Sequence, residues 1–175
     1  MGFVVRRSKR AKYIRLTVRP GGEVVLTAPH AFSVTTIERF LVRRSRWIEK
    51  SVQKMRHLVP LPGGKREYLA HRETARTFVH ERIAYWNSSY NFRFGRVAIK
   101  DTVSLWGSCS RRGNLNFSYK LLFLPRRLAD YIIVHELCHL AEQNHGARFW
   151  ALVGKTQPRY KDLRRELQKY VLGNR

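Results

Sequence analysis

The sequence predicts an α+β fold, and three observations support this. Residues 4–28 combine Val, Ile, Tyr and Thr with alternating charges, a pattern typical of strands. Residues 35–54 and 67–90 carry apolar side chains at helical spacing. Between these two stretches, residues 61–64 have the sequence Leu-Pro-Gly-Gly, which is the composition of a linker.

The linker predicts two domains. We expect residues 1–60 to form a basic, β-rich lobe with one helix, residues 65–175 to form the second domain, and the two to pack as one unit. In the first lobe, the Pro-Gly-Gly sequence at 20–22 predicts the turn of a hairpin. Ser33 or Thr35 is suited to cap the single amphipathic helix that follows.

The second domain is expected to contain a helix with unusual polar residues. Pro125 fits the first turn of this helix, which we expect over residues 126–143. The other elements that the pattern predicts are helices at 67–90 and 158–172 and strands at 94–99, 102–105 and 115–117.

The net charge is the most pronounced property of the composition. The 175 residues contain 35 Lys and Arg against 12 Asp and Glu, a formal charge of +23. A generic basic surface would keep the protein soluble, but so large a surplus favours a polyanionic partner, with nucleic acid as the first candidate. The basic residues recur throughout the chain and indicate no single binding surface. The sequence carries no indication of the oligomeric state.

Cysteine use and hydropathy indicate the compartment. The two cysteines, Cys109 and Cys138, form neither a disulfide framework nor a CxxC pair. No apolar run approaches the roughly 20 residues of a transmembrane helix, and the N-terminus lacks the apolar core of a secretory signal. We therefore expect a cytoplasmic protein with no transmembrane segment.

The string HELCH at residues 135–139 carries the chemistry. Positions four apart on a helix differ by only about 40° in direction, so His135 and His139 can bind one metal ion. Glu136 can reach a metal-bound water, where it would act as general base. This is the arrangement of zinc peptidases, so we expect one Zn²⁺ per chain and a protein or peptide substrate.

The same five-residue pattern can arise by chance on a charged helix. Here, however, it lies among Leu128, Ile132, Ile133, Val134, Leu137 and Leu140, so the helix is expected to be largely buried. Buried polar groups without partners cost roughly 1–3 kcal/mol each, and a metal ion would provide the missing partner.

A third metal ligand is needed, and two candidates are near. Glu142 lies three residues after His139, on the same face if the helix continues. His145 would point away on a straight helix and reaches the metal only if the helix ends first. Because Asn144 and Gly146 favour a helix stop between Gln143 and Gly146, the geometry modestly favours His145.

Motifs along most of the chain resemble those of the YgjP-like metallopeptidase family, relatives of the SprT-like zinc proteases. They are Arg-Arg-Ser-Lys-Arg at 6–10, Ala28-Pro29, Phe40 with Trp47-Ile48, Trp106-Gly-Ser-Cys, Asn116, Pro125, Asp130-Tyr131 and HELCHLAEQNHGARFW at 135–150. The resemblance implies a small zincin-like domain, with the HExxH helix beside a short sheet. It implies that His145 is the third ligand.

The resemblance also suggests where a substrate would lie. It implies that the strand near residues 114–118 is a sheet edge to which an extended peptide adds, with Trp106, Ser108 and Cys109 near the cleft. Candidate contacts to the substrate or to its developing oxyanion are Tyr131, Trp106 and Asn116. For Tyr131, one turn before His135, packing is the competing interpretation.

Three functions compete at this point. The first is a zinc peptidase, in which the charge would hold the enzyme near nucleic-acid-associated protein substrates. The second is a basic nucleic-acid-binding protein with a structural or weakly active zinc site. The third is a metal hydrolase of a non-peptide amide bond. Since structural zinc sites usually have four protein ligands and the sequence offers three plus a free base, the peptidase is favoured.

Overall fold

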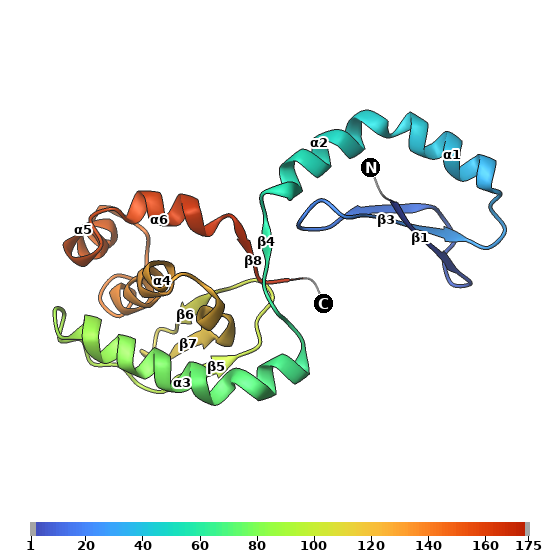
Figure 1. The fold of residues 1–175 in the computed structure, drawn as a ribbon. Coiled ribbons are helices and arrows are strands. Elements are labelled where there is room, and N and C mark those ends of the chain that lie inside the picture. The colour runs from blue at the N-terminus through green and yellow to red at the C-terminus, as the bar shows by residue number, and fades with distance from the viewer. Residues whose placement is uncertain (1–2, 174–175) are drawn as a thin grey trace. The chain divides into compact units, whose positions relative to one another are not determined.

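The computed structural model of the protein describes residues 3–173 (Figure 1). The chain divides into two compact units, with the boundary between Pro60 and Leu61. Both units contain helices and small sheets, and the predicted α+β class is confirmed. Within residues 3–173, no helix combines the length and the apolar character needed to cross a bilayer.

The first unit is built on a three-stranded sheet in the order β1-β3-β2. β2 (Arg15–Val18) and β3 (Val24–Pro29) are antiparallel, and the connection between them contains the predicted turn, where Gly21 and Gly22 both have φ of 86°. β1 (Phe3–Ser8) pairs with β3 in parallel, which the sequence pattern did not indicate. The short β4 (Val59–Pro60) ends the unit.

Two helices, rather than the single predicted one, cover one face of this sheet (Figure 1). α1 (Val34–Arg43) begins at Ser33, whose hydroxyl accepts a hydrogen bond from the Thr36 amide as predicted for a cap. α2 (Ser45–Arg56) starts after a break at Arg44. The break lets each helix cover a different part of the sheet. Ile37 of α1 packs near Leu26, and Ile48 of α2 packs with Val24.

The second unit contains another three-stranded sheet, in the order β5-β7-β6. β7 (Leu115–Ser118) is parallel to β5 (Val97–Lys100) and antiparallel to β6 (Gly107–Cys109). The expectation that residues 114–118 form an edge was therefore wrong, because a tight turn after β6 folds the chain back along β7 and β6 becomes the edge. The bond between the amide of Ser110 and the carbonyl of Asn114 closes that turn.

The strand predicted at residues 102–105 is also absent. The Thr102 hydroxyl donates to the Leu105 carbonyl at 2.6 Å, which closes a turn instead. The Thr102 carbonyl, in turn, accepts a hydrogen bond from the buried Lys120 ammonium. These side-chain bonds compete with strand pairing, so the strand begins only at Gly107.

The helices of the second unit pack around α4, which is buried on most of its surface (Figure 1). They are α3 (Lys65–Asn87), the 3₁₀-helix η1 (Tyr119–Phe123), α4 (Arg126–Cys138), α5 (Ala147–Thr156) and α6 (Tyr160–Leu167), followed by β8 (Tyr170–Val171). The sequence did not predict α5, and the helix expected over 158–172 ends at Leu167.

One buried ion pair joins α3 to α4. The Arg82 guanidinium donates two hydrogen bonds to the Asp130 carboxylate, at 2.6 and 3.0 Å. Both side chains are buried, and the guanidinium also lies over the ring of Tyr85, 4.4 Å from its centroid. The pair therefore holds the helix that carries residues 135–138 against its longest neighbour.

Candidate metal centre

The site begins on α4, where two imidazoles leave the helix in the same direction. His135 lies in the last turn of α4, and His139 is its C-cap with a helical backbone conformation, so the four-residue spacing places both rings on one face. Their Nε2 atoms are 3.2 Å apart. The two side chains therefore lie together, as the helical spacing predicted.

α4 ends at Cys138, earlier than the predicted stop between Gln143 and Gly146. The amides of Leu140 and Ala141 turn back to carbonyls three residues earlier, at Leu137 and Cys138. The Gln143 side chain donates to the His139 carbonyl at 2.6 Å. These bonds satisfy carbonyls that a continuing helix would have used, so the helix stops without a glycine.

The early end of α4 brings His145 back to the other two histidines. A bond from the Gly146 amide to the Asn144 carbonyl closes the turn around it. His145 Nε2 lies 3.0 Å from His135 Nε2. Among the residues that the structure describes, the donor atoms of His135, His139 and His145 form a group within 4.8 Å of one another, and Glu142 is not part of it.

The three nitrogens fit a small divalent cation. Tetrahedral zinc with Zn–N bonds of about 2.0–2.1 Å would separate its nitrogen ligands by about 3.3 Å, close to the observed spacing. Burial, followed by the neighbouring His139, lowers the pKa of His135 to about 3, and burial also lowers the pKa of His139. Neutral imidazoles are the form that binds metals.

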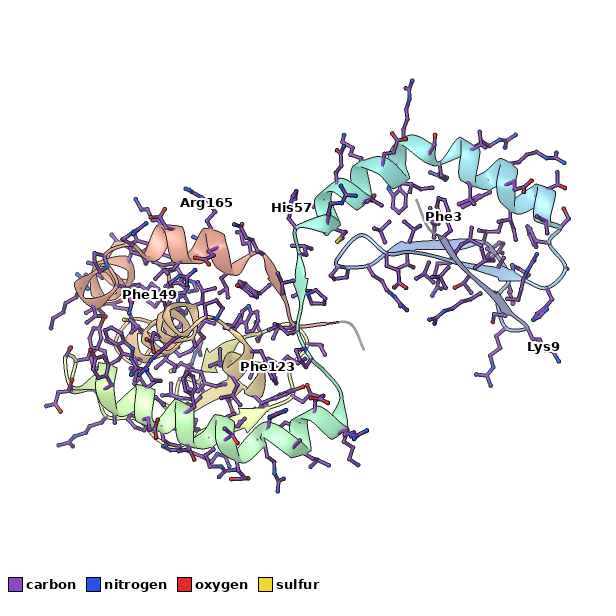
Figure 2. The ribbon with its side chains drawn as sticks, viewed as in Figure 1. Phe3, Lys9, His57, Phe123, Phe149 and Arg165 are labelled. Atoms are coloured by element: carbon purple, nitrogen blue, oxygen red, sulfur yellow. The ribbon has the colours of Figure 1, made fainter. Side chains whose placement is uncertain are left out.

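Packing and one hydrogen bond orient the rings. The His139 Nδ1 lies 3.0 Å from the Glu142 carbonyl oxygen, which accepts a hydrogen bond from Nδ1–H and so leaves Nε2 free as a donor atom for a metal. His135 Nδ1 is buried without a hydrogen-bond partner among residues 3–173, so its ring is oriented by packing. Phe149 of α5 points toward α4, with its ring 4.8 Å from that of His135 (Figure 2).

A second layer of aromatic residues supports His145. Its ring stacks against Trp150 at 5.6 Å, and Trp150 stacks in turn on Tyr160 of α6 at 5.0 Å. The Arg164 guanidinium lies 5.5 Å from the Trp150 ring. In the sequence, Phe149 and Trp150 end the string at 135–150 that carries the family resemblance. The sequence gave no sign of the α6 residues, because helical periodicity does not show which helix packs against which.

Glu136 lines the same cavity as the histidines, and its side chain packs against the backbone of β6. Its side chain is 6% exposed, and burial raises its pKa to about 8. It fits because residue 107 of β6 is a glycine, since a Cβ there would lie 2.7 Å from Glu136 Cγ. The cavity has a volume of about 430 Å³, and its lining includes Glu136 and all three histidines.

The remaining predicted contacts divide into two groups. Trp106, Ser108 and Cys109 line the cavity as expected, and so does the buried Tyr131. Asn116 does not line it. Its amide donates to the hydroxyl of Ser108, a lining residue, at 3.1 Å. Burial, followed by the Glu136 carboxylate, raises the pKa of the Cys109 thiol.

Six further residues line the cavity that the sequence did not single out as site residues. They are Ser104, Leu105, Gly107, Ile132, Gln143 and Leu167. Most of them belong to segments far apart in the chain, and only the fold brings them together. Gln143 was considered only as the limit of a helix.

The class of protein follows from a family match, which identifies a metallopeptidase domain. The chain belongs to the YgjP-like metallopeptidase domain family, which matches residues 12–69 and 65–170. The resemblance to this family is thereby confirmed, and α4, which carries residues 135–138, lies beside a small sheet as expected. The protein is a metal-dependent hydrolase of protein or peptide substrates.

Two solved structures are similar to part of the chain. The metallopeptidase zymogen of Pyrococcus abyssi abylysin is 24% identical, with a TM-score of 0.48, over 52% of this chain and 93% of that one. The metallopeptidase zymogen of Methanocaldococcus jannaschii jannalysin is 19% identical, with a TM-score of 0.47, over 52% and 94%. No curated protein matches the chain.

Proposed function

We propose that the protein is a zinc-dependent peptidase in which His135, His139 and His145 hold the metal and Glu136 is the general base. The observation that carries this proposal is the convergence of three Nε2 atoms in a cavity that also contains a buried carboxylate. Three nitrogen donors leave a zinc ion with an open position, which is typical of catalytic rather than structural sites.

The residues of the cavity have separate tasks in this proposal. Bound zinc would lower the pKa of a water molecule toward about 7 and polarise the substrate carbonyl. Glu136 takes the proton from the attacking water and delivers it to the leaving amine. Tyr131 donates a hydrogen bond to the oxygen on which negative charge develops. The substrate backbone would pair with the edge strand β6, beside Trp106.

Metal analysis combined with peptidase assays tests this function. The wild type is expected to contain about one zinc per chain and to cleave an unfolded protein such as casein. Glu136→Gln should keep the zinc and lose the cleavage, whereas His145→Ala should lose zinc. His80→Ala, an exposed histidine on α3, is the matched control and should keep both.

Two results would overturn the assignment. One is a metal content unchanged by His145→Ala, and the other is full cleavage by Glu136→Gln. A protein that retains zinc but shows no cleavage in any form would instead support the structural-zinc alternative.

We also propose that the substrates are proteins associated with nucleic acid. The formal charge of +23 supports this, because a polyanion would concentrate such a protein on its surface. Cys109 and Cys138 are both free thiols, which supports a reducing compartment such as the cytoplasm.

A further inference from the structure

The first unit has a groove along the free side of β2. In the sheet order β1-β3-β2, the far side of β2 has no strand partner among residues 3–173. Two hollows of about 270 and 370 Å³ lie between residues 14–16, at the start of β2, and the helices α1 and α2. Both are lined by Ile14 and Phe40, so they adjoin, and we call the two together the β2 groove.

The floor of the β2 groove is apolar and largely aromatic. Besides Ile14 and Phe40, it contains Phe32, Leu16 and Trp47. Trp47 is 47% exposed, which is unusual for so large an apolar side chain on a helix that otherwise packs on its sheet. Flat aromatic surfaces of this kind can stack with the faces of nucleobases.

The rim of the β2 groove carries positive charge only. Arg39, Arg43 and Arg44 line it and are exposed, and no carboxylate lines either hollow. None of the three forms an ion pair within the described residues. The first 60 residues contain 14 Lys and Arg against three Asp and Glu, and one of those three, Glu23, is paired with Arg19. Arg44 lies over the Phe40 ring, 6.0 Å from its centroid, and a guanidinium in this position keeps its charge for an external anion, as the other two arginines do.

The same basic character continues past the end of the β2 groove. A further hollow of about 700 Å³, which shares Ile14 and Leu16 with the groove, is lined by Arg10, Lys12 and Arg15 together with Tyr13, which is 80% exposed. Lys9, at the far end of β1, points into solvent (Figure 2). Exposed basic residues of the first unit, with one exposed aromatic residue, thus extend beyond the groove itself.

We propose that the β2 groove binds single-stranded nucleic acid, with bases against Phe40 and Trp47 and phosphates against the three arginines. A duplex hides the faces of its bases, so it could use the rim but not the floor. An acidic peptide could pair with the edge of β2, but it would not require exposed aromatic rings. This inference gives a place to the nucleic-acid association proposed above and requires nothing of the metal site.

The test is binding of a fluorescent 20-nucleotide oligothymidine to the full-length protein, measured by anisotropy over a range of salt concentrations. The triple substitution Arg39→Gln/Arg43→Gln/Arg44→Gln should weaken binding at least about tenfold. It should lower the slope of log K against log salt by about 2, as expected for three lost phosphate contacts on a single strand.

The matched control removes three charges from the same helical region outside the β2 groove. Arg46→Gln/Lys50→Gln/Lys54→Gln removes three positive charges, as the groove triple does, so the two variants have the same net charge. These exposed residues line neither hollow, so the variant leaves the groove intact. It should weaken binding much less. Trp47→Ala should cost about tenfold, and Val42→Ala, an exposed apolar residue outside the groove, should cost nothing.

Several outcomes would overturn the proposal. Equal losses in both triples would mean that only the overall charge attracts the strand. A duplex that binds as tightly as the single strand, with no effect of Trp47→Ala, would remove the role of the floor, and poly-glutamate competing as well as the oligonucleotide would favour an acidic peptide. Casein cleavage by the groove triple is expected to be unchanged, so a failure here is distinguishable from a failure of the peptidase assignment.

Discussion

Gly107 lies so close to Glu136 that a Cβ on it would be 2.7 Å from the Glu136 Cγ and 2.8 Å from Oε1. The glycine belongs to the edge strand β6 and the glutamate to α4, so this contact joins the sheet to the helix at the centre of the cavity. A side chain at residue 107 would occupy the space that the Glu136 carboxylate now fills.

Gly107→Ala is therefore expected to displace Glu136 while leaving the histidines in place. Since a displacement of about 1 Å of a catalytic group can cost about 100-fold, kcat/KM for peptide cleavage should fall by that order while zinc content stays the same. Gly154→Ala is the control, because its Cβ would meet nothing closer than 3.9 Å. Wild-type activity in Gly107→Ala would show that Glu136 need not occupy its present position.

The Arg82–Asp130 pair should be important for the stability of the second unit. Asp130→Ala leaves a buried guanidinium without a partner, so the free energy of unfolding is expected to fall by about 3–5 kcal/mol. Glu73→Ala, which breaks an exposed contact with Arg76 on α3, should cost less than about 1 kcal/mol. Chemical denaturation measures both.

The double variant Arg82→Met/Asp130→Leu separates pairing from packing. Apolar side chains of similar size should restore much of the lost stability, because no unpaired charge remains. If the double variant is as unstable as the sum of its single variants, the pair is not the reason for the loss.

The local parts of the site could be predicted from the sequence, and the non-local parts could not. The spacing of His135 and His139 follows from helical geometry alone. To place His145, one must know where α4 ends. That end is set by the Gln143 side chain and by turns whose sequence contains no glycine or proline. Local spacing therefore favoured the residue that joins the histidine cluster, but with the wrong helix boundary.

Strand pairing shows the same difference more clearly. The hairpin of β2 and β3 was predicted from its turn, whereas the parallel pairing of β1 with β3 and the central position of β7 depend on contacts between distant residues. The cavity is lined by β6 because β7 is central. For that reason, the residues next to Gly107 in the sequence do not indicate that it lies against Glu136.

Metal removal is expected to lower the thermal stability of the protein. The Nε2 atoms of His139 and His145 lie 3.2 and 3.0 Å from that of His135, a spacing that suits three ligands of one cation. Zinc at 100 times its dissociation constant would stabilise the folded protein by about 2.7 kcal/mol. Calorimetry should therefore show a lower Tm after chelation and recovery when zinc is added.

Two variants make the metal experiment specific. His139→Ala should melt at the same temperature with and without zinc, whereas Glu136→Gln should respond as the wild type does. A zinc response that persists in His139→Ala would place the stabilising metal elsewhere.

Asn116 is expected to act on catalysis through Ser108. The Asn116 amide donates to the Ser108 hydroxyl at 3.1 Å, and of these two residues Ser108 lines the cavity whereas Asn116 does not. One such hydrogen bond contributes about 1 kcal/mol, so Asn116→Ala and Ser108→Ala should each lower kcat/KM about fivefold. Because both remove the same interaction, the double variant should be little worse than either single one. Steady-state kinetics on one peptide measures the cycle. Independent, multiplying effects would instead mean that Asn116 contacts the substrate itself, as the sequence first suggested.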